Sequence, residues 1–255
     1  MDKYDIIRKI ANGSYGDVFL GKIKDKEVVI KKLFTKNDLE RESCKIINEL
    51  QCKYFVNFIE KIDDNIIYDY FNGNVLLDEL YYLNIDDIKK ISFELIDFLY
   101  TLELKNYYYL DLNLNNILID DKKNIKIIDY STINHKKSKI NCKIGTYYFA
   151  PPEYILDNII IKDKFDIFSF GVILFNLLLK YMPIKRISDY KKKCLCENNC
   201  DLDNCLLNIF KKYNKVKNNE LLINLLINSL QFNHKKRLNI NQIYNLINIV
   251  SEKHM

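Results

Sequence analysis

The sequence of 255 residues predicts an α+β protein with two lobes: a small antiparallel β-sheet carrying one helix, then a mainly α-helical lobe. Two patterns predict this division. Short runs rich in β-branched and aromatic residues fill roughly the first 70 residues, with one helical stretch among them. From residue 85 onward, apolar residues recur at intervals of three and four, which is typical of amphipathic helices. Three prolines and six glycines leave little material for a linker, so we expect a single domain over residues 1–255.

The N-terminal lobe is expected to span about residues 1–70. Strands are expected over residues 4–10, 17–22, 27–33, 56–62 and 65–70. A helix is expected over residues 39–50, and Gly13 and Gly16 mark the turn between the first two strands because glycine lets a backbone turn tightly. A hinge over about residues 69–73 leads to the second lobe.

The C-terminal lobe is expected to span about residues 74–255. Its first helix is indicated by the spacing of Ile85, Ile88, Ile91, Leu95, Leu99 and Leu102. Further helices are expected over residues 166–179, 219–230 and 240–250. The longest apolar run, residues 168–179, is too short to span a bilayer, and the N-terminus carries no signal-peptide pattern. We therefore expect no membrane partner.

Composition narrows the class of protein further. A content of 48% apolar and 29% charged residues is typical of a globular protein. The net charge of +5 comes from lysines scattered among acidic residues, so we expect no nucleic-acid partner. Seven cysteines without an export signal indicate reduced thiols, hence an intracellular, cytoplasmic protein, which we expect to be a monomer. The excess of Asn, Ile, Lys and Tyr suits an AT-rich genome, such as that of a parasite or a large DNA virus; a viral protein would lie in the host cytoplasm or the virion.

Six short motifs follow one another along the chain. They are residues 10–18 (IANGSYGDV), 28–31 (VVIK), 109–118 (YLDLNLNNIL), 129–131 (DYS), 145–153 (GTYYFAPPE) and 166–171 (DIFSFG). Each alone is weak, because paired glycines are common in hairpins and most carboxylates are helix caps or solvated charges. Their order, on the expected strands and loops, resembles the protein kinase family over nearly the whole chain. The Gly-Thr pair at 145–146 is similar to the serine/threonine branch.

The resemblance implies a two-lobed protein-kinase-like fold and transfer of the γ-phosphoryl group of ATP to Ser/Thr hydroxyls of a protein substrate of unknown identity. Asp111 is implied as the residue that accepts or orients the hydroxyl proton, and Lys31 as the cation on the α and β phosphates. Asn116 and Asp129 are implied as ligands of Mg²⁺, with Mn²⁺ as an alternative, because hard cations prefer oxygen ligands.

The resemblance also implies a nucleotide site between the lobes. The residues implied to contact ATP are Ala11, Gly13, Gly16, Val18, Val29, Lys31, Asp69, Phe71 and Leu118. Val18 and Val29 would lie above the adenine and Leu118 below it, with Tyr68 behind the pocket. Glu42, or else Glu40, is implied to pair with Lys31. Lys32 should point to the opposite face of its strand.

Several positions depart from the family pattern. Ala11 stands in place of a loop glycine, and Val29 in place of a smaller alanine, which would crowd the adenine. Leu110 replaces an arginine that binds a phosphorylated loop, so we expect no switch by that charge pair. Ser131 replaces a glycine and loses backbone freedom, while Asn113 replaces a lysine that offsets charge on the transferring phosphoryl group.

These departures leave alternatives to an active protein kinase. One is a catalytically weak or inactive pseudokinase that acts as a nucleotide-binding scaffold or a partner-binding module. Another is a kinase of small molecules on the same fold, although the segment at 151–153 favours a peptide substrate.

Three expectations concern other parts of the chain. Glu153 is implied to form a structural ion pair with Arg237. A basic segment, either solvated or suited to acidic substrates, contains His135, Lys136, Lys137, Lys139 and Lys143. A second cluster, of reduced thiols or zinc ligands without paired Cys-x-x-Cys arms, contains Cys194, Cys196, Cys200 and Cys205.

Overall fold

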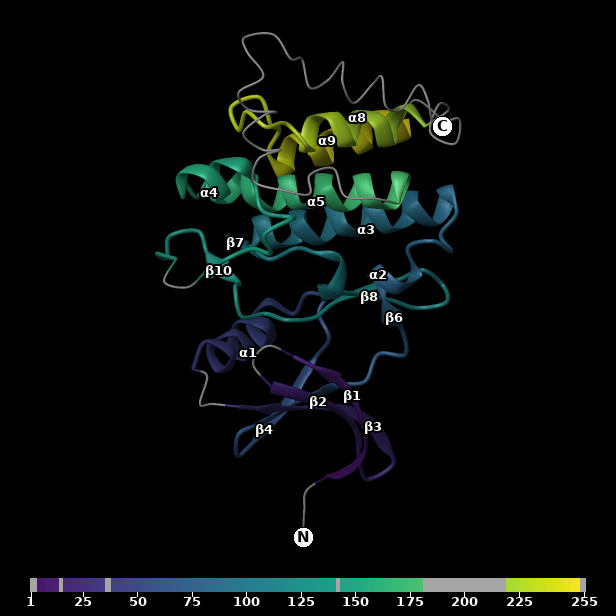
Figure 1. The fold of residues 1–255 in the computed structure, drawn as a ribbon, viewed down its shortest axis with the longest axis vertical. Helices are drawn as coiled ribbons and strands as arrows, with labels where there is room; N and C mark the ends of the chain where they lie inside the picture. Colours follow the sequence, from purple (N-terminus) through teal and green to yellow (C-terminus); the bar gives the residue numbers. More distant parts are fainter. Residues whose placement is uncertain (1–3, 14–15, 35–37, 141–142, 181–218, 253–255) are drawn as a thin grey trace.

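A computed structural model of the chain describes residues 4–13, 16–34, 38–140, 143–180 and 219–252. Figure 1 shows a sheet at one end of the molecule, helices at the other, and short strands between them. This arrangement confirms the α+β class with two lobes. The cysteine cluster at 194–205 lies outside the described residues.

The N-terminal lobe is a five-stranded antiparallel sheet in the order β1-β2-β3-β5-β4. Its strands are β1 (Asp5–Asn12), β2 (Gly16–Ile23), β3 (Lys26–Leu33), β4 (Phe58–Ile62) and β5 (Asn65–Asp69). Each bound differs from the predicted one by two residues or fewer. The helix α1 (Asp38–Leu50) follows β3 and lies beside the sheet in Figure 1.

The central strand β3 alternates between two faces. Val28 and Ile30 are fully buried, whereas Val29 and Lys31 are half-buried on the other face. Lys32 returns to the first face, where its Nζ lies 5.3 Å from the centre of the Phe19 ring. The prediction that Lys31 and Lys32 point in opposite directions is therefore confirmed.

Short elements connect the lobes. They are β6 (Asn74–Val75), α2 (Leu76–Glu79), β7 (Tyr107–Tyr108), a 3₁₀ turn (Leu114–Asn116), β8 (Ile117–Ile119), β9 (Ile125–Ile127) and β10 (Asn134–His135). β6, β8 and β9 form one small sheet, and β7 pairs with β10 in another. Figure 1 shows β6, β7, β8 and β10 between the five-stranded sheet and the long helices. Asp111 follows β7 along the chain and Asp129 follows β9, so each small sheet leads into one of these two residues.

The C-terminal lobe consists mainly of helices. They are α3 (Ile85–Leu104), α4 (Pro152–Asp157), α5 (Lys162–Leu179), α8 (Glu220–Ser229) and α9 (Ile240–Glu252). Asn84 starts α3 with a capping box, since its side chain accepts from the N–H of Asp87 and the Asp87 carboxylate accepts from the N–H of Asn84. Among the described residues, the helices are too short or too polar to cross a membrane.

The central helix α5 is buried on nearly all sides, which explains why its sequence is almost uniformly apolar. It begins at Lys162, one turn earlier than the predicted start at Asp166, because Asp166 lies inside the helix and does not cap it. Gly171 permits close packing against α8, since a Cβ atom there would lie 2.8 Å from Ser229 Oγ.

Candidate active site

The carboxylate of Asp111 lies at the centre of a group of neutral hydrogen-bond donors. The Thr146 hydroxyl donates to its Oδ1 atom over 2.8 Å, and Asn113 Nδ2 lies 3.3 Å from the same oxygen. Asn116 Nδ2 donates to Oδ2 over 3.1 Å. Both amides also donate to the main-chain carbonyl of Asp111, over 3.1 and 3.0 Å. These bonds hold the carboxylate in one orientation, and none of the three donors carries a charge.

The environment of Asp111 makes it a stronger base. Burial raises the pKa of its carboxyl group, the hydrogen bond from Thr146 lowers it, and the nearby charge of Asp129 raises it again; the net shift is upward. A proton acceptor works best when its pKa approaches the working pH. The geometry therefore suits Asp111 to orient a hydroxyl group and take its proton.

The backbone just before Asp111 is held by a buried carboxylate on α5. Asp166 accepts the N–H of Tyr109 over 2.9 Å and the N–H of Leu110 over 2.8 Å. Leu110 has a φ of 66°, in the left-handed region, so the two bonds support a strained turn. Burial raises the pKa of Asp166 to about 7, although the two N–H groups act in the opposite direction.

Asp166 should make stability depend on pH. Because its pKa is about 7 in the folded protein against an ordinary 3.8, the folded state binds more protons than the unfolded state between these values. The free energy of unfolding should fall as pH rises through this range. Asp166→Asn lacks this contribution. The free energy of unfolding of the variant, relative to that of wild type, should therefore rise by about 3 kcal/mol between pH 4 and pH 7. Urea unfolding at pH 4, 5.5 and 7 measures the shift, and a constant difference would contradict it.

Two tyrosine hydroxyls fasten the backbone that leads to Asp129. The Tyr109 hydroxyl lies 2.7 Å from the carbonyl oxygen of Ile128 and 2.6 Å from that of Asp129. The Tyr130 hydroxyl lies 2.9 Å from both the Val56 and Ile127 carbonyls. Both tyrosines are buried, so these bonds are shielded from water. They hold Asp129 at a φ of 66°.

Ser131 contributes more than the sequence suggested. We expected a loss of backbone freedom where it replaces a glycine, but its φ is negative, and Asp129 instead has the left-handed conformation. The Ser131 hydroxyl donates to Asp129 Oδ1 over 2.8 Å, and the Ser131 N–H lies 3.2 Å from the same oxygen. The serine therefore fits the turn and orients the Asp129 carboxylate.

The donor set fits a hard cation. Asn116 uses its amide nitrogen on Asp111, which leaves its amide oxygen for a metal, and Ser131 occupies only one of the two oxygens of Asp129. No group of three His, Cys, Asp or Glu side chains that could hold a metal occurs within the described ranges. A metal here would need phosphate oxygens to complete its shell, which is the usual situation of protein-bound Mg²⁺.

The side chains predicted to contact ATP come from both lobes. Val18 lies opposite Lys31 in the β2–β3 register, and Leu118 in β8 lies opposite Val75. Val18, Val29 and Leu118 are half-buried, so each keeps apolar surface that a planar base could cover. Ala11, at the end of β1, is exposed.

The glycine-rich turn is closed by its backbone. The Gly13 N–H donates to the Gly16 carbonyl over 2.9 Å, and a Cβ atom on Gly16 would lie 2.3 Å from the Lys32 carbonyl oxygen. Only glycine fits at position 16.

The hinge residues have contacts of their own. The Asp69 carboxylate binds Lys26 and the Asn57 amide, so a nucleotide contact at Asp69 would have to come from its backbone. Phe71 is half-buried against the core. Behind the hinge, Tyr68 is buried, and its ring centre lies 5.9 Å from that of Tyr130.

The pairing of Lys31 with Glu42, or else with Glu40, stays a prediction. Glu42 is exposed on α1, whereas the next residues, Ser43 and Cys44, are buried. Ser43, Cys44 and Ile47 share the buried face of the helix, because residues three and four apart lie on one face, and Glu42 lies outside that face.

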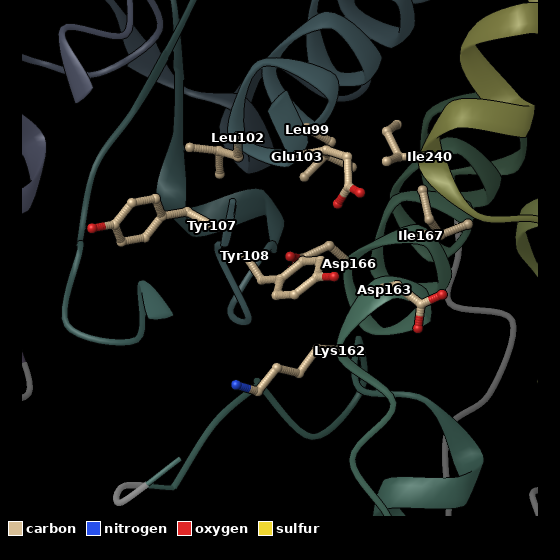
Figure 2. A pocket seen from close by; sticks show the side chains of 10 residues that line it. All are labelled: Leu99, Leu102, Glu103, Tyr107, Tyr108, Lys162, Asp163, Asp166, Ile167 and Ile240. Carbon is tan, nitrogen blue, oxygen red and sulfur yellow. The ribbon is translucent and has the colours of Figure 1, made fainter. Parts of the chain in front are cut away.

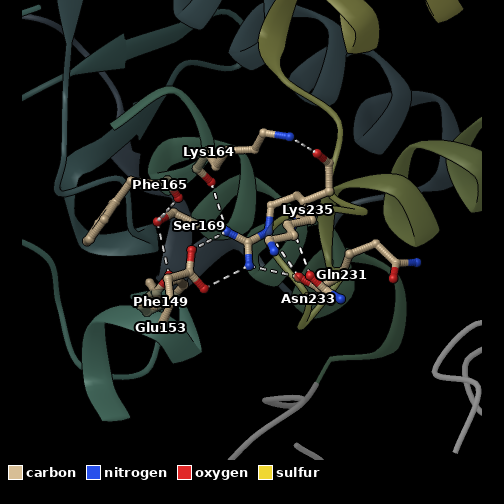
Figure 3. A network of polar contacts seen from close by, with 9 residues as sticks. Phe149, Glu153, Lys164, Phe165, Ser169, Gln231, Asn233 and Lys235 are labelled. Carbon is tan, nitrogen blue, oxygen red and sulfur yellow. Dashed lines mark hydrogen bonds and ion pairs between the residues drawn. The ribbon is translucent and has the colours of Figure 1, made fainter. Parts of the chain in front are cut away.

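A buried ion pair holds the C-terminal end of the segment at residues 146–153 (Figure 3). Arg237 donates to both oxygens of Glu153, over 2.7 and 3.0 Å, and the two side chains are 0% and 6% exposed. The remaining guanidinium protons reach the carbonyls of Gln231 and Lys164. The predicted pair is confirmed, and it fixes the chain that runs from Thr146 to Glu153.

Two contributions to the site were missed from the sequence. Thr146 was assigned only as part of a motif, yet it binds Asp111 across 35 positions of the chain. Asn113 was considered only as a lost lysine, yet it is buried and holds Asp111 and Thr146 together. A Gly-Thr pair after a loop was the only signal for Thr146.

Comparison with known proteins finds one matching family and several relatives. A family model described as the protein kinase domain matches residues 4–246. The serine/threonine-protein kinase STY46 of Arabidopsis thaliana is 29% identical over 199 residues, covering 69% of this chain and 33% of that protein. CBL-interacting serine/threonine-protein kinase 21 of Arabidopsis thaliana is 30% identical over 200 residues, covering 71% and 48%. Serine/threonine-protein kinase CLA4 of Candida albicans is 29% identical over 198 residues, covering 69% and 20%. The matches span less than half the length of each of these relatives.

Proposed function

The chain belongs to the protein kinase family, and from this premise we propose that it transfers the γ-phosphoryl group of ATP to serine or threonine hydroxyls of a protein substrate. The observation that carries the proposal is the arrangement around Asp111, where Thr146, Asn113 and Asn116 fix a basic carboxylate beside the loop that carries Asp129. Serine/threonine kinases among its relatives support the choice of hydroxyl. A cytoplasmic monomer without nucleic-acid or membrane partners stays a prediction.

Each side chain has a defined part in this mechanism. The Asp111 carboxylate would accept a hydrogen bond from the substrate hydroxyl and take its proton as the phosphorus–oxygen bond forms. Lys31 would bind the phosphates that stay with the leaving nucleotide. Asn116 and Asp129 would hold Mg²⁺, which neutralises charge on the phosphates when bound. Because Thr146 and the asparagines already hold the carboxylate, little reorganisation is needed at the moment of transfer.

One observation favours a second candidate, a nucleotide-binding scaffold without catalysis. Asn113 is buried, at 3% exposure, in the place where the family pattern has a lysine, and its amide supplies a dipole but no charge. Loss of one such electrostatic contact typically costs about two to three orders of magnitude in rate. We therefore expect phosphoryl transfer to be slow. A protein that bound nucleotide but transferred no phosphate would act only as a scaffold.

Incubation of the purified protein with radiolabelled ATP, Mg²⁺ and generic protein substrates tests the proposal. We expect label on serine or threonine, and about two to three orders of magnitude less label with Asp129→Asn, because the metal loses an anionic ligand. Asp121→Asn, outside the site, is the matched control. Nucleotide binding without any transfer would instead assign the scaffold role. Label that is unaffected by Asp129→Asn would remove Asp129 from the mechanism.

A further inference from the structure

Lys162, the first residue of α5, gathers the backbone of one short segment around its amino group. Its Nζ lies 2.8 Å from Asn134 Oδ1, 3.3 Å from the His135 carbonyl oxygen and 3.2 Å from that of Lys136. It also bonds the carbonyl of Ser138. All four acceptors are neutral oxygens, and they all belong to residues 134–138.

The Lys162 side chain points away from the acidic residues nearest to it on α5. Figure 2 shows the Lys162 amine extending away from the carboxylates of Asp163 and Asp166. Burial lowers the pKa of Lys162, so the amine loses hydration here. The oxygens that converge on the amine replace the lost water around its positive charge, and this favours a backbone that curves around the lysine.

The segment 134–138 is tied to the strand that leads to Asp111. Asn134 and His135 form β10, which pairs with Tyr108 and Tyr107 of β7. Lys136 adds a second anchor, since its amine lies 2.5 Å from Glu103 Oε1 and 5.7 Å from the centre of the Tyr108 ring. Lys162 thus holds from α5 a segment that lies directly against the start of the catalytic loop.

The chain beyond this segment is held by apolar packing. Leu110, which stands where the family pattern has an arginine, is fully buried in a cluster with Ile144, Ala150 and Phe165. Ile140 packs against the same cluster. A buried leucine cannot bind a phosphate group, so this apolar packing does not require a phosphorylated residue.

We propose that Lys162 is the positioning residue that holds residues 134–138 against the catalytic loop, so that Thr146 reaches Asp111 without phosphorylation of the segment. The amine supplies from within the chain the positive charge that position 110 lacks, and it binds carbonyl oxygens that are always present. The effect on rate rests on the proposed kinase function, whereas the effect on the segment itself does not.

Lys162→Met tests this proposal, because methionine keeps much of the apolar stem and removes the amine. Lys164→Met is the matched control, since Lys164 lies on the same helix and bonds a single carbonyl, that of Arg237. Limited trypsin digestion with mass spectrometry reads the segment directly through cleavage after Lys136, Lys137 and Lys139. We expect cleavage there to be about tenfold faster in Lys162→Met than in wild type or Lys164→Met.

The rate gives a second readout. In Lys162→Met, kcat should fall about tenfold with the KM for ATP unchanged, and Lys162→Arg should restore most of it, since arginine keeps the charge. Wild type treated with a phosphatase should keep both its protection and its rate. Equal cleavage of wild type and Lys162→Met would overturn the proposal, as would protection that disappears after phosphatase treatment. If the protein transfers no phosphate, the proposed function fails, but the cleavage rates still decide the role of Lys162.

Discussion

Replacing Asp111 with asparagine should lower kcat for phosphoryl transfer by about two to four orders of magnitude. The amide has nearly the same shape as the carboxylate, so the loop should keep its fold. The amide cannot take a proton, however. Its NH₂ group would also face either the Thr146 hydroxyl or the Asn116 amide, which now donate hydrogen bonds to the carboxylate. Turnover at saturating ATP measures the loss.

The control separates chemistry from binding. Asp86→Asn removes a carboxylate whose side chain is 83% exposed at the start of α3, and it should leave kcat unchanged. The Kd for ATP, measured by calorimetry in the presence of Mg²⁺, should agree within about twofold between wild type and Asp111→Asn. Label transfer that survives Asp111→Asn unchanged would remove Asp111 from the mechanism.

Replacing Arg237 with methionine should lower the free energy of unfolding by about 3 to 5 kcal/mol. The change leaves Glu153 buried without its partner, and it removes the donors to Gln231 and Lys164. A buried charge that loses its partner costs more than the pair contributes, because the desolvation penalty stays. Urea unfolding monitored by far-UV circular dichroism measures the loss.

A surface ion pair provides the comparison. Lys89 and Asp86 lie 3.3 Å apart with exposed side chains, so Lys89→Met should cost less than about 1 kcal/mol. The double variant Arg237→Met/Glu153→Gln should recover part of the loss, because the amide carries no charge. Should Arg237→Met prove too unstable to purify, Glu153→Gln alone should still cost about 2 kcal/mol. A loss below about 1 kcal/mol in Arg237→Met would contradict the structural role of the pair.

Much of the fold could be predicted because short-range patterns control it. A run of β-branched residues located β3, and the alternation of side chains along a strand placed Lys31 and Lys32 on opposite faces. The three- and four-residue spacing located α3, whose capping residue Asn84 is visible in the sequence. The start of α5 was predicted one turn late, because a buried aspartate inside the helix was read as its beginning.

The site was predicted in part. Asp111 and Asn116 lie in contact, as their spacing on one loop suggests. The choice between Glu42 and Glu40 stays a prediction, because helix propensity does not determine which face of α1 is buried; the packing of Ser43, Cys44 and Ile47 decides it. Ser131 could be seen as a departure, but its bond to Asp129 depends on a left-handed turn at residue 129 that no residue type required.

The sequence by itself determined the class of fold, the order of the motifs and the absence of cations at positions 110 and 113. Only the tertiary structure decided what stands in their place. Leu110 joins an apolar cluster with Ile144 and Phe165, Asn113 bridges Asp111 and Thr146, and Lys162 holds the segment at 134–138. Except for the bond between Asn113 and Asp111 within one loop, these partners are separated by about 24 or more positions in the sequence. Contacts at such separations depend on how the helices and strands pack, and local residue patterns carry no record of that packing.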